Sequence, residues 1–285
     1  MIKTKILVTG SKGQLGQCLK EASAFYEETV LFVFTSQKEL DITKSNQVFD
    51  YFKTHNFDYC INCAAYTAVD KAEREKEKAF NINVTGVKNL AKACLESETT
   101  LIHISTDFVF DGQNCKAYKE DSITNPISVY GRTKLEGENV IQSILNKYYI
   151  IRTSWLYSEF GNNFVKTILN LSLSKKEIDV VDDQIGTPTY AKDLTKVILK
   201  IVKEKKQYGL YHYSNEGIAT WYDFAKAIFE IKKIQLKINP VDSEKFKTEA
   251  LRPNFSLLNK SKIRENFKIS IPYWKESLCE CLKKL

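Results

Sequence analysis

The chain has 285 residues, 43% of them hydrophobic, and a formal net charge of +7 at pH 7. This hydrophobic share suffices for a large packed core, so the composition excludes a chain that is disordered overall. The basic excess forms no long arm, zinc-finger spacing or basic-aromatic RNA motif, and no run reaches about 18 apolar residues, so we expect neither a nucleic-acid partner nor a membrane span.

Strand-like and helix-like segments alternate through the first half of the chain. Short β-rich apolar runs predict strands, and segments with apolar residues along one side predict helices. The predicted strands are residues 5–8, 31–35, 59–62, 101–105 and 149–152, and the predicted helices are residues 15–24, 45–55, 72–97 (with a bend near Gly86) and 130–146. This repeated β-α-β-α order predicts an α/β fold, a Rossmann-type doubly wound parallel sheet with helices on both faces.

The pattern changes after about residue 153. Strands at Val180-Val181 and residues 209–213 and a helix at 221–231 are the clearest later elements. We expect an NAD(P)-binding Rossmann domain over residues 1–153, with segments from about 178–202 returning to it. Residues 154–285 should form a smaller, mixed α/β lobe that mainly binds substrate.

The cysteines and histidines indicate no metal or disulfide framework. The cysteine count of seven is odd, and the first residues show no apolar region or cleavage site of a secretory signal, so we expect free thiols and a cytoplasmic protein. Cys60 and Cys63 form a C-x-x-C inside an apolar run, without a second pair at zinc spacing. We expect structural roles for His55, His103 and His212.

A glycine-rich turn follows the first predicted strand. The spacing G-x-x-G-x-x-G places Gly10 at the tight turn, Gly13 where the backbone approaches a pyrophosphate, and Gly16 where helix and strand pack closely. The helix that follows offers its amides and positive dipole end to phosphates. The second strand does not end in the acidic residue typical of NAD-selective sites, so we expect NADPH to be accepted, with Lys12, Thr35 or Ser36 near its 2′-phosphate.

A tyrosine and a lysine near the start of the last predicted helix form a Y-x-x-x-K motif. Tyr130 and Lys134 lie four residues apart and so share one face of the helix. A neighbouring ammonium lowers the pKa of a tyrosine from about 10, which makes Tyr130 a candidate general acid toward a carbonyl. Lys134 could also hold the ribose of a cofactor. Thr106 follows the strand 101–105, where its hydroxyl can bond the same carbonyl oxygen.

These motifs resemble those of the extended short-chain dehydrogenase/reductases, and the chain is similar to the dTDP-4-dehydrorhamnose reductase family over nearly its whole length. The glycine turn and Y-x-x-x-K are shared by a wide superfamily, whereas the second-lobe stretches are more specific. The segments that carry the resemblance are residues 10–16, 62–73, 83–86, 105–112, 130–134, 152–155, 182–189 and 252–253.

The resemblance implies reduction of the C4 keto group of dTDP-4-dehydro-L-rhamnose by NADPH or NADH. It implies Tyr130 as proton donor, Lys134 as its partner and ribose ligand, and Thr106 as a residue that tunes the site. The expected cofactor-binding residues, with those of the glycine turn, are Gly10, Lys12, Gly13, Gln14, Leu15, Asp41, Ile42, Ala64, Ala65, Tyr66, Thr67, Tyr130 and Lys134. The expected residues at the dTDP-sugar are Thr106, Asp107, Phe108, Trp155 and Arg252.

Some of these roles have a direct physical basis. Trp155 offers a flat apolar face to the sugar or base, and Arg252 a planar fork suited to a pyrophosphate. Two positions depart from the family. Phe108 stands where many members carry tyrosine, so one hydrogen bond to the sugar is in doubt. Cys18 stands where some members carry a glutamate that helps to bind Mg²⁺ between subunits; a thiol is a poor Mg²⁺ ligand, which leaves Mg²⁺ and the choice between monomer and homodimer open.

Alternative functions share much of this pattern. A nucleotide-sugar dehydratase or epimerase uses the same glycine turn and tyrosine–lysine pair, but dehydratases typically carry Asp-Glu after the active-site threonine. Here Asp107 is followed by Phe108, which disfavours that chemistry. Another 4-ketoreductase that makes a different 6-deoxyhexose and a non-catalytic regulatory subunit of the same fold also remain open.

Overall fold

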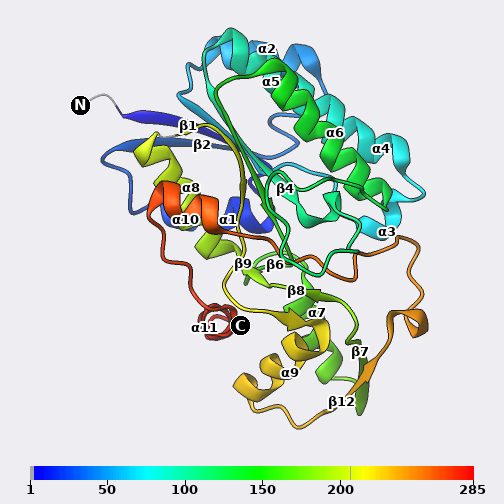
Figure 1. Ribbon diagram of the computed structural model, residues 1–285. Helices are drawn as coiled ribbons and strands as arrows, with labels where there is room; N and C mark the ends of the chain where they lie inside the picture. The colour runs from blue at the N-terminus through cyan, green and yellow to red at the C-terminus, as the bar shows by residue number, and fades with distance from the viewer. Residues whose placement is uncertain (1–2, 206) are drawn as a thin grey trace.

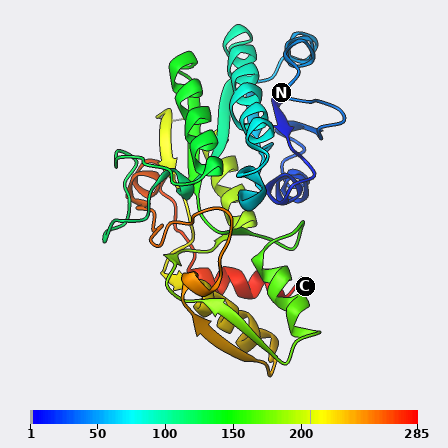
Figure 2. The ribbon, with the colours of Figure 1, turned by 90° about the vertical axis from the view of Figure 1, so that its right-hand side faces the viewer.

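A six-stranded parallel sheet organises the larger lobe (Figures 1 and 2). The computed structural model describes residues 3–205 and 207–285, so the first two residues of the predicted domain 1–153 lie outside the described part. The strands are β1 (Thr4–Thr9), β2 (Val30–Thr35), β3 (Tyr59–Asn62), β4 (Thr100–Thr106), β5 (Tyr148–Thr153) and β10 (Gly209–His212), in the order β10-β5-β4-β3-β1-β2. The predicted α/β fold is confirmed, and each strand predicted in the first half lies within an observed one.

The register of the sheet brings polar residues together at the carboxyl ends of the strands. Thr9 lies opposite Thr35 on one side and Asn62 on the other, and Asn62 lies opposite His103. The chain runs outward from β1 to β2 and then crosses to β3 on the far side of β1, so the strand order reverses between β1 and β3. Open α/β sheets bind ligands in the crevice at such a reversal.

Helices cover both faces of this sheet. One face carries α1 (Gln14–Ser23), α8 (Ala191–Glu204) and α10 (Ser261–Phe267), and the other carries α2 (Ser45–Thr54), α5 (Val87–Glu96) and α6 (Val129–Ile144) (Figure 1). Each helix turns an apolar stripe inward. In α8, for example, Leu194, Val197, Ile198 and Ile201 are all buried at helical spacing.

The predicted long helix over residues 72–97 is wrong in its first part. The chain forms two short helices, α3 (Val69–Ala72) and α4 (Lys76–Phe80), and then a π-helical turn (Asn81–Gly86) that leads directly into α5. The expected irregularity near Gly86 is this turn. A Cβ on Gly86 would lie 2.7 Å from Ile42 Cγ1, so glycine lets the turn pack against that side chain. π-Turns of this kind are frequent at functional sites.

The smaller lobe has its own hydrophobic core (Figure 2). Its two-stranded sheets pair β7 (Glu177–Val181) with β12 (Lys237–Val241), β6 (Leu156–Tyr157) with β9 (Thr189–Tyr190), and β8 (Ile185–Gly186) with β11 (Ala219–Thr220). Its helices are α7 (Phe164–Ser172), α9 (Trp221–Lys232) and α11 (Trp274–Leu282), and a 3-10 turn lies at Ser243–Lys245. Another 3-10 turn, Asp107–Val109, directly follows β4 of the large sheet.

The segments that return to the large sheet overlap the predicted range of about 178–202 in part. Residues 178–181 belong to β7, which pairs with β12 outside that sheet. The returning chain is α8, which packs on α1, followed by β10 at the edge of the sheet and later by α10. Parallel pairing requires a crossover helix, and α8 supplies the one that leads to β10. We therefore propose that α8, β10 and α10 belong with residues 1–153.

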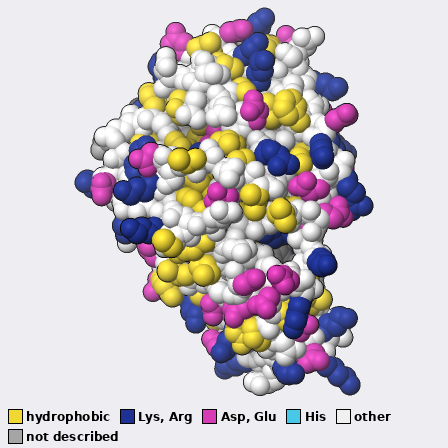
Figure 3. Space-filling view, turned by 45° about the vertical axis from the view of Figure 1, so that its right-hand side comes forward, with side chains coloured by type: hydrophobic (Ala, Val, Ile, Leu, Met, Phe, Trp, Pro, Cys, Tyr) yellow, Lys and Arg dark blue, Asp and Glu magenta, His cyan; other side chains and the backbone are white. Residues whose placement is uncertain are grey.

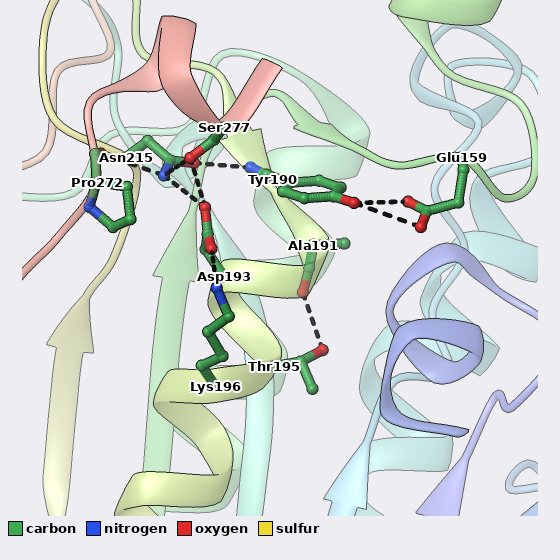
Figure 4. A network of polar contacts seen from close by, with 9 residues as sticks. All are labelled: Glu159, Tyr190, Ala191, Asp193, Thr195, Lys196, Asn215, Pro272 and Ser277. Atoms are coloured by element: carbon green, nitrogen blue, oxygen red, sulfur yellow. Dashed lines mark hydrogen bonds and ion pairs between the residues drawn. The ribbon is translucent and has the colours of Figure 1, made fainter. Parts of the chain in front are cut away.

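A buried polar network fixes the junction between the lobes (Figure 4). Asn215 Nδ2 donates to Asp193 Oδ2 on α8 (3.0 Å) and to Ser277 Oγ on α11 (2.9 Å). Asn215 Oδ1 accepts the Tyr190 amide at 2.8 Å, and Lys196 pairs with Asp193 at the surface. Because these polar groups are mutually satisfied, the network holds three separate segments in one arrangement.

Basic and acidic side chains are interspersed over the face in Figure 3, without a continuous basic stripe there. Among the described residues, none of the helices combines the length and apolar character needed to cross a membrane.

Candidate active site

The glycine turn has the geometry of a close backbone approach. Gly10 has φ +64°, and a Cβ there would lie 2.6 Å from the Ala64 backbone nitrogen. Gly16 lies against the same turn, since its Cβ would come within 2.6 Å of Ser11 Cα. Gly13 is the N-cap of α1 and has no side chain to accept the first amides of the helix, so these amides are available to a phosphate.

A cavity of about 430 Å³ opens beside this turn. It lies between the turn, the segment after β2 and the segment after β3. Seven of the residues expected at the cofactor line it, namely Gly10, Lys12, Gly13, Asp41, Ile42, Ala64 and Ala65. The other expected cofactor residues do not line it, namely Gln14, Leu15, Tyr66, Thr67, Tyr130 and Lys134.

Gln14 has a different environment from the one its predicted role suggests. Its Oε1 accepts hydrogen bonds from Ser158 Oγ (3.0 Å) and Asn163 Nδ2 (2.8 Å), and its Nε2 donates to Leu156 O (3.3 Å). The side chain therefore ties the glycine turn to the smaller lobe, and only the backbone of Gln14 stays available to a cofactor. Leu15 likewise places its side chain in the core, where it is 4% exposed.

Two basic side chains line the cavity, those of Lys12 and Lys38, together with Ser36. Thr35, one of three residues suggested for a 2′-phosphate, is 2% exposed and donates its hydroxyl to Val8 O, so it does not reach the cavity. Lys38 was not among the residues expected there, although it lies only three residues after β2.

Two asparagines hold the loop that follows β3. Asn62 Oδ1 accepts the Ala64 amide at 3.1 Å. Asn83, in the π-helical turn, accepts the Tyr66 amide at 2.9 Å and donates to Tyr66 O at 3.2 Å. Neither asparagine was predicted to have a role. In the sequence, Asn62 precedes the expected cofactor loop and Asn83 follows it, and this was the only sign that they hold the loop.

Tyr130, Thr106 and Phe108 meet where β4 ends and α6 begins. Ser128 caps α6 with its side chain, which sets the direction of the first turn and so of Tyr130. The Thr106 hydroxyl donates to Asp107 Oδ1 at 3.0 Å and lies close enough to the Tyr130 phenol to lower its pKa. The Phe108 ring meets the Tyr130 ring edge to face, with centroids 5.5 Å apart. The structure thus brings together three of the predicted residues.

The expected lowering of the Tyr130 pKa does not occur in this structure. Burial raises it to about 12, and the nearby Asp107 adds to the rise, while the Thr106 hydroxyl opposes it. Lys134 Nζ donates to Ile104 O at 2.6 Å and lies 3.2 Å from His103 Nε2. Burial lowers the pKa of Lys134 to about 8. Tyr130 therefore carries its proton at neutral pH, as a proton donor must.

Asp107 is a buried carboxylate with a spare acceptor. It is 2% exposed, and its Oδ2 has no hydrogen-bond partner among the described residues. Burial raises its pKa to about 6. A buried acceptor of this kind suits a hydroxyl donor from a ligand.

Trp155 is held in a strained conformation. Its φ is +46°, which is rare for an aromatic residue, and its ring stacks on Trp221 with centroids 3.6 Å apart. A Cβ on Gly186 would lie 2.6 Å from Trp155 Cε2 and 2.9 Å from Ser256 Oγ. Gly186, the glycine of the D-D-Q-I-G stretch, therefore leaves the space that the Trp155 ring occupies. Trp221 was not predicted.

Arg252 reaches across from the smaller lobe to α3. Its Nη1 and Nη2 donate to the two carboxylate oxygens of Asp70, at 3.0 and 2.7 Å. This pair lowers the pKa of Asp70. Asp70 lies three residues after Thr67, so the pair links the expected cofactor loop to the expected substrate residue.

The residues around Cys18 do not fit a Mg²⁺ site. Burial raises the pKa of the Cys18 thiol to about 12, so it stays protonated. The nearby carboxylates of Glu21 and Glu159 already pair with Lys284, at 3.0 and 2.5 Å. Within residues 3–205 and 207–285, no three His, Cys, Asp or Glu side chains are grouped to hold a metal.

The glycine turn at the strand reversal and the threonine–tyrosine–lysine group beside it define a class: this is an NAD(P)H-dependent oxidoreductase of the short-chain dehydrogenase/reductase type. Comparison with known proteins gives the particular family. The family described as "RmlD substrate binding domain" matches residues 4–285. The chain belongs to this family, that of the dTDP-4-dehydrorhamnose reductases.

Individual relatives match over their full length. The dTDP-4-dehydrorhamnose reductase of Aggregatibacter actinomycetemcomitans is 39% identical over 96% of this chain and 97% of its own. The crystal structure of dTDP-4-dehydrorhamnose reductase from Bacillus anthracis in complex with NADP has a TM-score of 0.96 at 39% identity and covers all of both chains. The structure of the enzyme from Clostridium acetobutylicum has a TM-score of 0.94 at 43% identity, over 98% of this chain and 99% of its own.

Proposed function

We propose that this protein reduces the C4 keto group of dTDP-4-dehydro-L-rhamnose and forms dTDP-L-rhamnose. NADPH, when bound at the glycine turn, supplies the hydride. One observation carries the proposal: a hydroxyl, a carboxylate with a free acceptor and a protonated phenol, from Thr106, Asp107 and Tyr130, lie together at the carboxyl end of β4. This set can bind a sugar and protonate its carbonyl oxygen.

Tyr130 donates the proton. Its raised pKa keeps the phenol protonated at neutral pH, and the alkoxide that forms on the sugar is more basic than a phenolate, so the transfer runs downhill. Thr106 orients the phenol through its nearby hydroxyl. Lys134 in its ammonium form stabilises the phenolate that remains and can donate to ribose hydroxyls.

Three further residues bind the sugar nucleotide. Asp107 Oδ2 accepts a sugar hydroxyl, and Trp155 packs its face on the sugar or the base. Arg252 contacts the pyrophosphate. Its three hydrogen bonds, two to Asp70 and one to Ala250 O, use three of its five N–H donors, so Asp70 fixes the guanidinium and leaves donors for phosphate oxygens.

NADPH is the preferred cofactor in this proposal. Lys12 and Lys38 line the cavity together with Ser36, where a 2′-phosphate would gain two cations. The cytoplasm is the proposed place of action, because all seven cysteines are free thiols, as expected in a reducing compartment.

The test is to supply dTDP-4-dehydro-L-rhamnose and NADPH to the purified protein. We expect one NADPH to be consumed for each sugar reduced, and NMR of the product to show dTDP-L-rhamnose. A different 6-deoxyhexose as the product would show that the protein is another 4-ketoreductase acting on the same keto sugar. Sugar conversion without net loss of NADPH would instead point to an epimerase or dehydratase, and no reaction to a non-catalytic subunit.

A further inference from the structure

A chain of buried hydrogen bonds leads from the loop after β3 to Lys134. The Ala64 amide donates to Asn62 Oδ1 (3.1 Å), Asn62 Nδ2 lies 3.0 Å from His103 Nδ1, and His103 Nε2 lies 3.2 Å from Lys134 Nζ. Asn62, His103 and Lys134 are 1%, 0% and 2% exposed. Each polar atom in this chain therefore depends on its neighbours in the protein.

The first hydrogen bond sets the direction of the others. A backbone amide can only donate, so Asn62 turns its oxygen to Ala64 and its amino group to His103. His103 Nδ1 must then accept, and the neutral imidazole carries its proton on Nε2. This N–H points at Lys134 Nζ. An ammonium has no lone pair to accept it, whereas a neutral amine has one.

We propose that His103 is a positioning residue for the reduction: held by Asn62 as the Nε2–H tautomer, it donates to the Lys134 amine and stabilises its neutral form, so that Lys134 gains and loses a proton in the pH range where the enzyme works. Lys134 also donates to Ile104 O, and both forms of the side chain can do so. Of these two hydrogen-bond contacts, only the one with His103 distinguishes the neutral amine from the ammonium. This inference rests on the proposed function, because the charge of Lys134 matters through its roles at Tyr130 and at the ribose.

The other groups around Lys134 act in both directions. Burial favours the neutral amine, and lowers the pKa of Lys134 to about 8. Glu138, one turn along α6, and Cys63, after β3, favour the ammonium. Glu138 is itself paired with Arg152 at 2.7 Å, so its charge is already shared. His103, whose own pKa is held well below its usual range by burial and by Lys134, stays neutral and adds the directional contact.

The variant His103→Leu tests this proposal. Leucine removes the N–H that faces Lys134 Nζ and supplies no other donor, so the neutral amine loses its hydrogen bond. We expect the pKa of Lys134 to rise by about one unit. In the wild type, where the ammonium is the active form, kcat/KM should fall as the pH rises through about 8. Near pH 9 the variant should keep about fivefold more of its own plateau activity than the wild type does.

A direct titration separates this proposal from the proposed function. The ¹³Cε signal of Lys134, identified by its loss in Lys134→Arg, is followed against pH by NMR without any substrate. The matched control is His212→Leu, because His212 is also 0% exposed but contacts Tyr118 O and Arg152. An unshifted Lys134 titration in His103→Leu, or an equal shift in His212→Leu, would overturn the role of His103 whatever the enzyme reduces.

A measurement on the wild-type protein needs no variant, so it can be made even if the His103 variant does not fold. The ¹⁵N shifts of the His103 ring should show Nε2 protonated and Nδ1 unprotonated. A ring protonated on Nδ1, or on both nitrogens, at neutral pH would contradict the proposal.

Discussion

The change Tyr130→Phe separates the chemistry of the site from its architecture. The phenylalanine keeps the ring that meets Phe108 edge to face and loses only the hydroxyl near Thr106. One hydrogen bond contributes about 1 kcal/mol to stability, so the free energy of unfolding should fall by no more than that. Loss of a general acid lowers the rate by about 10²- to 10⁴-fold, or about 3–5 kcal/mol in activation free energy.

The assay is single-turnover oxidation of NADPH with the keto sugar, followed by absorbance, beside a fluorescence titration of cofactor binding. We expect the rate to fall as above and the dissociation constant for NADPH to change by no more than about twofold. The matched control is Tyr157→Phe, which removes a buried hydroxyl without a hydrogen-bond partner among the described residues and should leave the rate unchanged. A Tyr130→Phe variant with a near-normal rate would refute the assignment of the proton donor.

Three further expectations concern the sugar and the cofactor. Asp107, with a pKa of about 6, gains a proton as the pH falls through that value, so wild-type kcat/KM should drop below about pH 6. The variant Asp107→Asn should be less active, and its kcat/KM should not fall further below about pH 6. A fall that persists in the variant would exclude Asp107 as its cause. Lys12→Glu combined with Lys38→Glu should cut the ratio of kcat/KM for NADPH over NADH at least about tenfold; an unchanged ratio would remove both lysines from the 2′-phosphate. Arg252→Lys and Asp70→Asn should each raise KM for the sugar nucleotide about tenfold with a smaller effect on kcat, as steady-state kinetics would show; a KM unchanged in Asp70→Asn would mean that Arg252 needs no support.

The sheet of the larger lobe could be predicted because its strands are short, apolar and separated by amphipathic helices. Its core positions follow from local pattern alone. The π-helical turn Asn81–Gly86 could not be predicted, because it depends on contacts of Asn83 with Tyr66 and of Gly86 with Ile42, far away in the sequence. The apolar stripe of α8 is visible in the sequence and would have predicted this helix, but the helix was not predicted.

The site residues were likewise predictable where a local pattern places them, and not where their properties depend on packing. Thr106 and Tyr130 could be placed together, because one ends a strand and the other begins a helix of a known pattern. The tyrosine–lysine spacing was also informative, but the pKa of Tyr130 depends on burial, which the motif does not specify. His103 looked structural in the sequence, and its contact with Lys134 becomes visible only once β4 and α6 are packed.

The central claim is that this site delivers a hydrogen to C4 of the keto sugar. The most direct measurement uses NADPH with deuterium at the transferable position, dTDP-4-dehydro-L-rhamnose and the purified protein, with the product examined by NMR. Deuterium at C4 of dTDP-L-rhamnose, one atom per molecule, is the expected result. Deuterium at another ring carbon, deuterium that returns to the cofactor, or no labelled product would contradict the account.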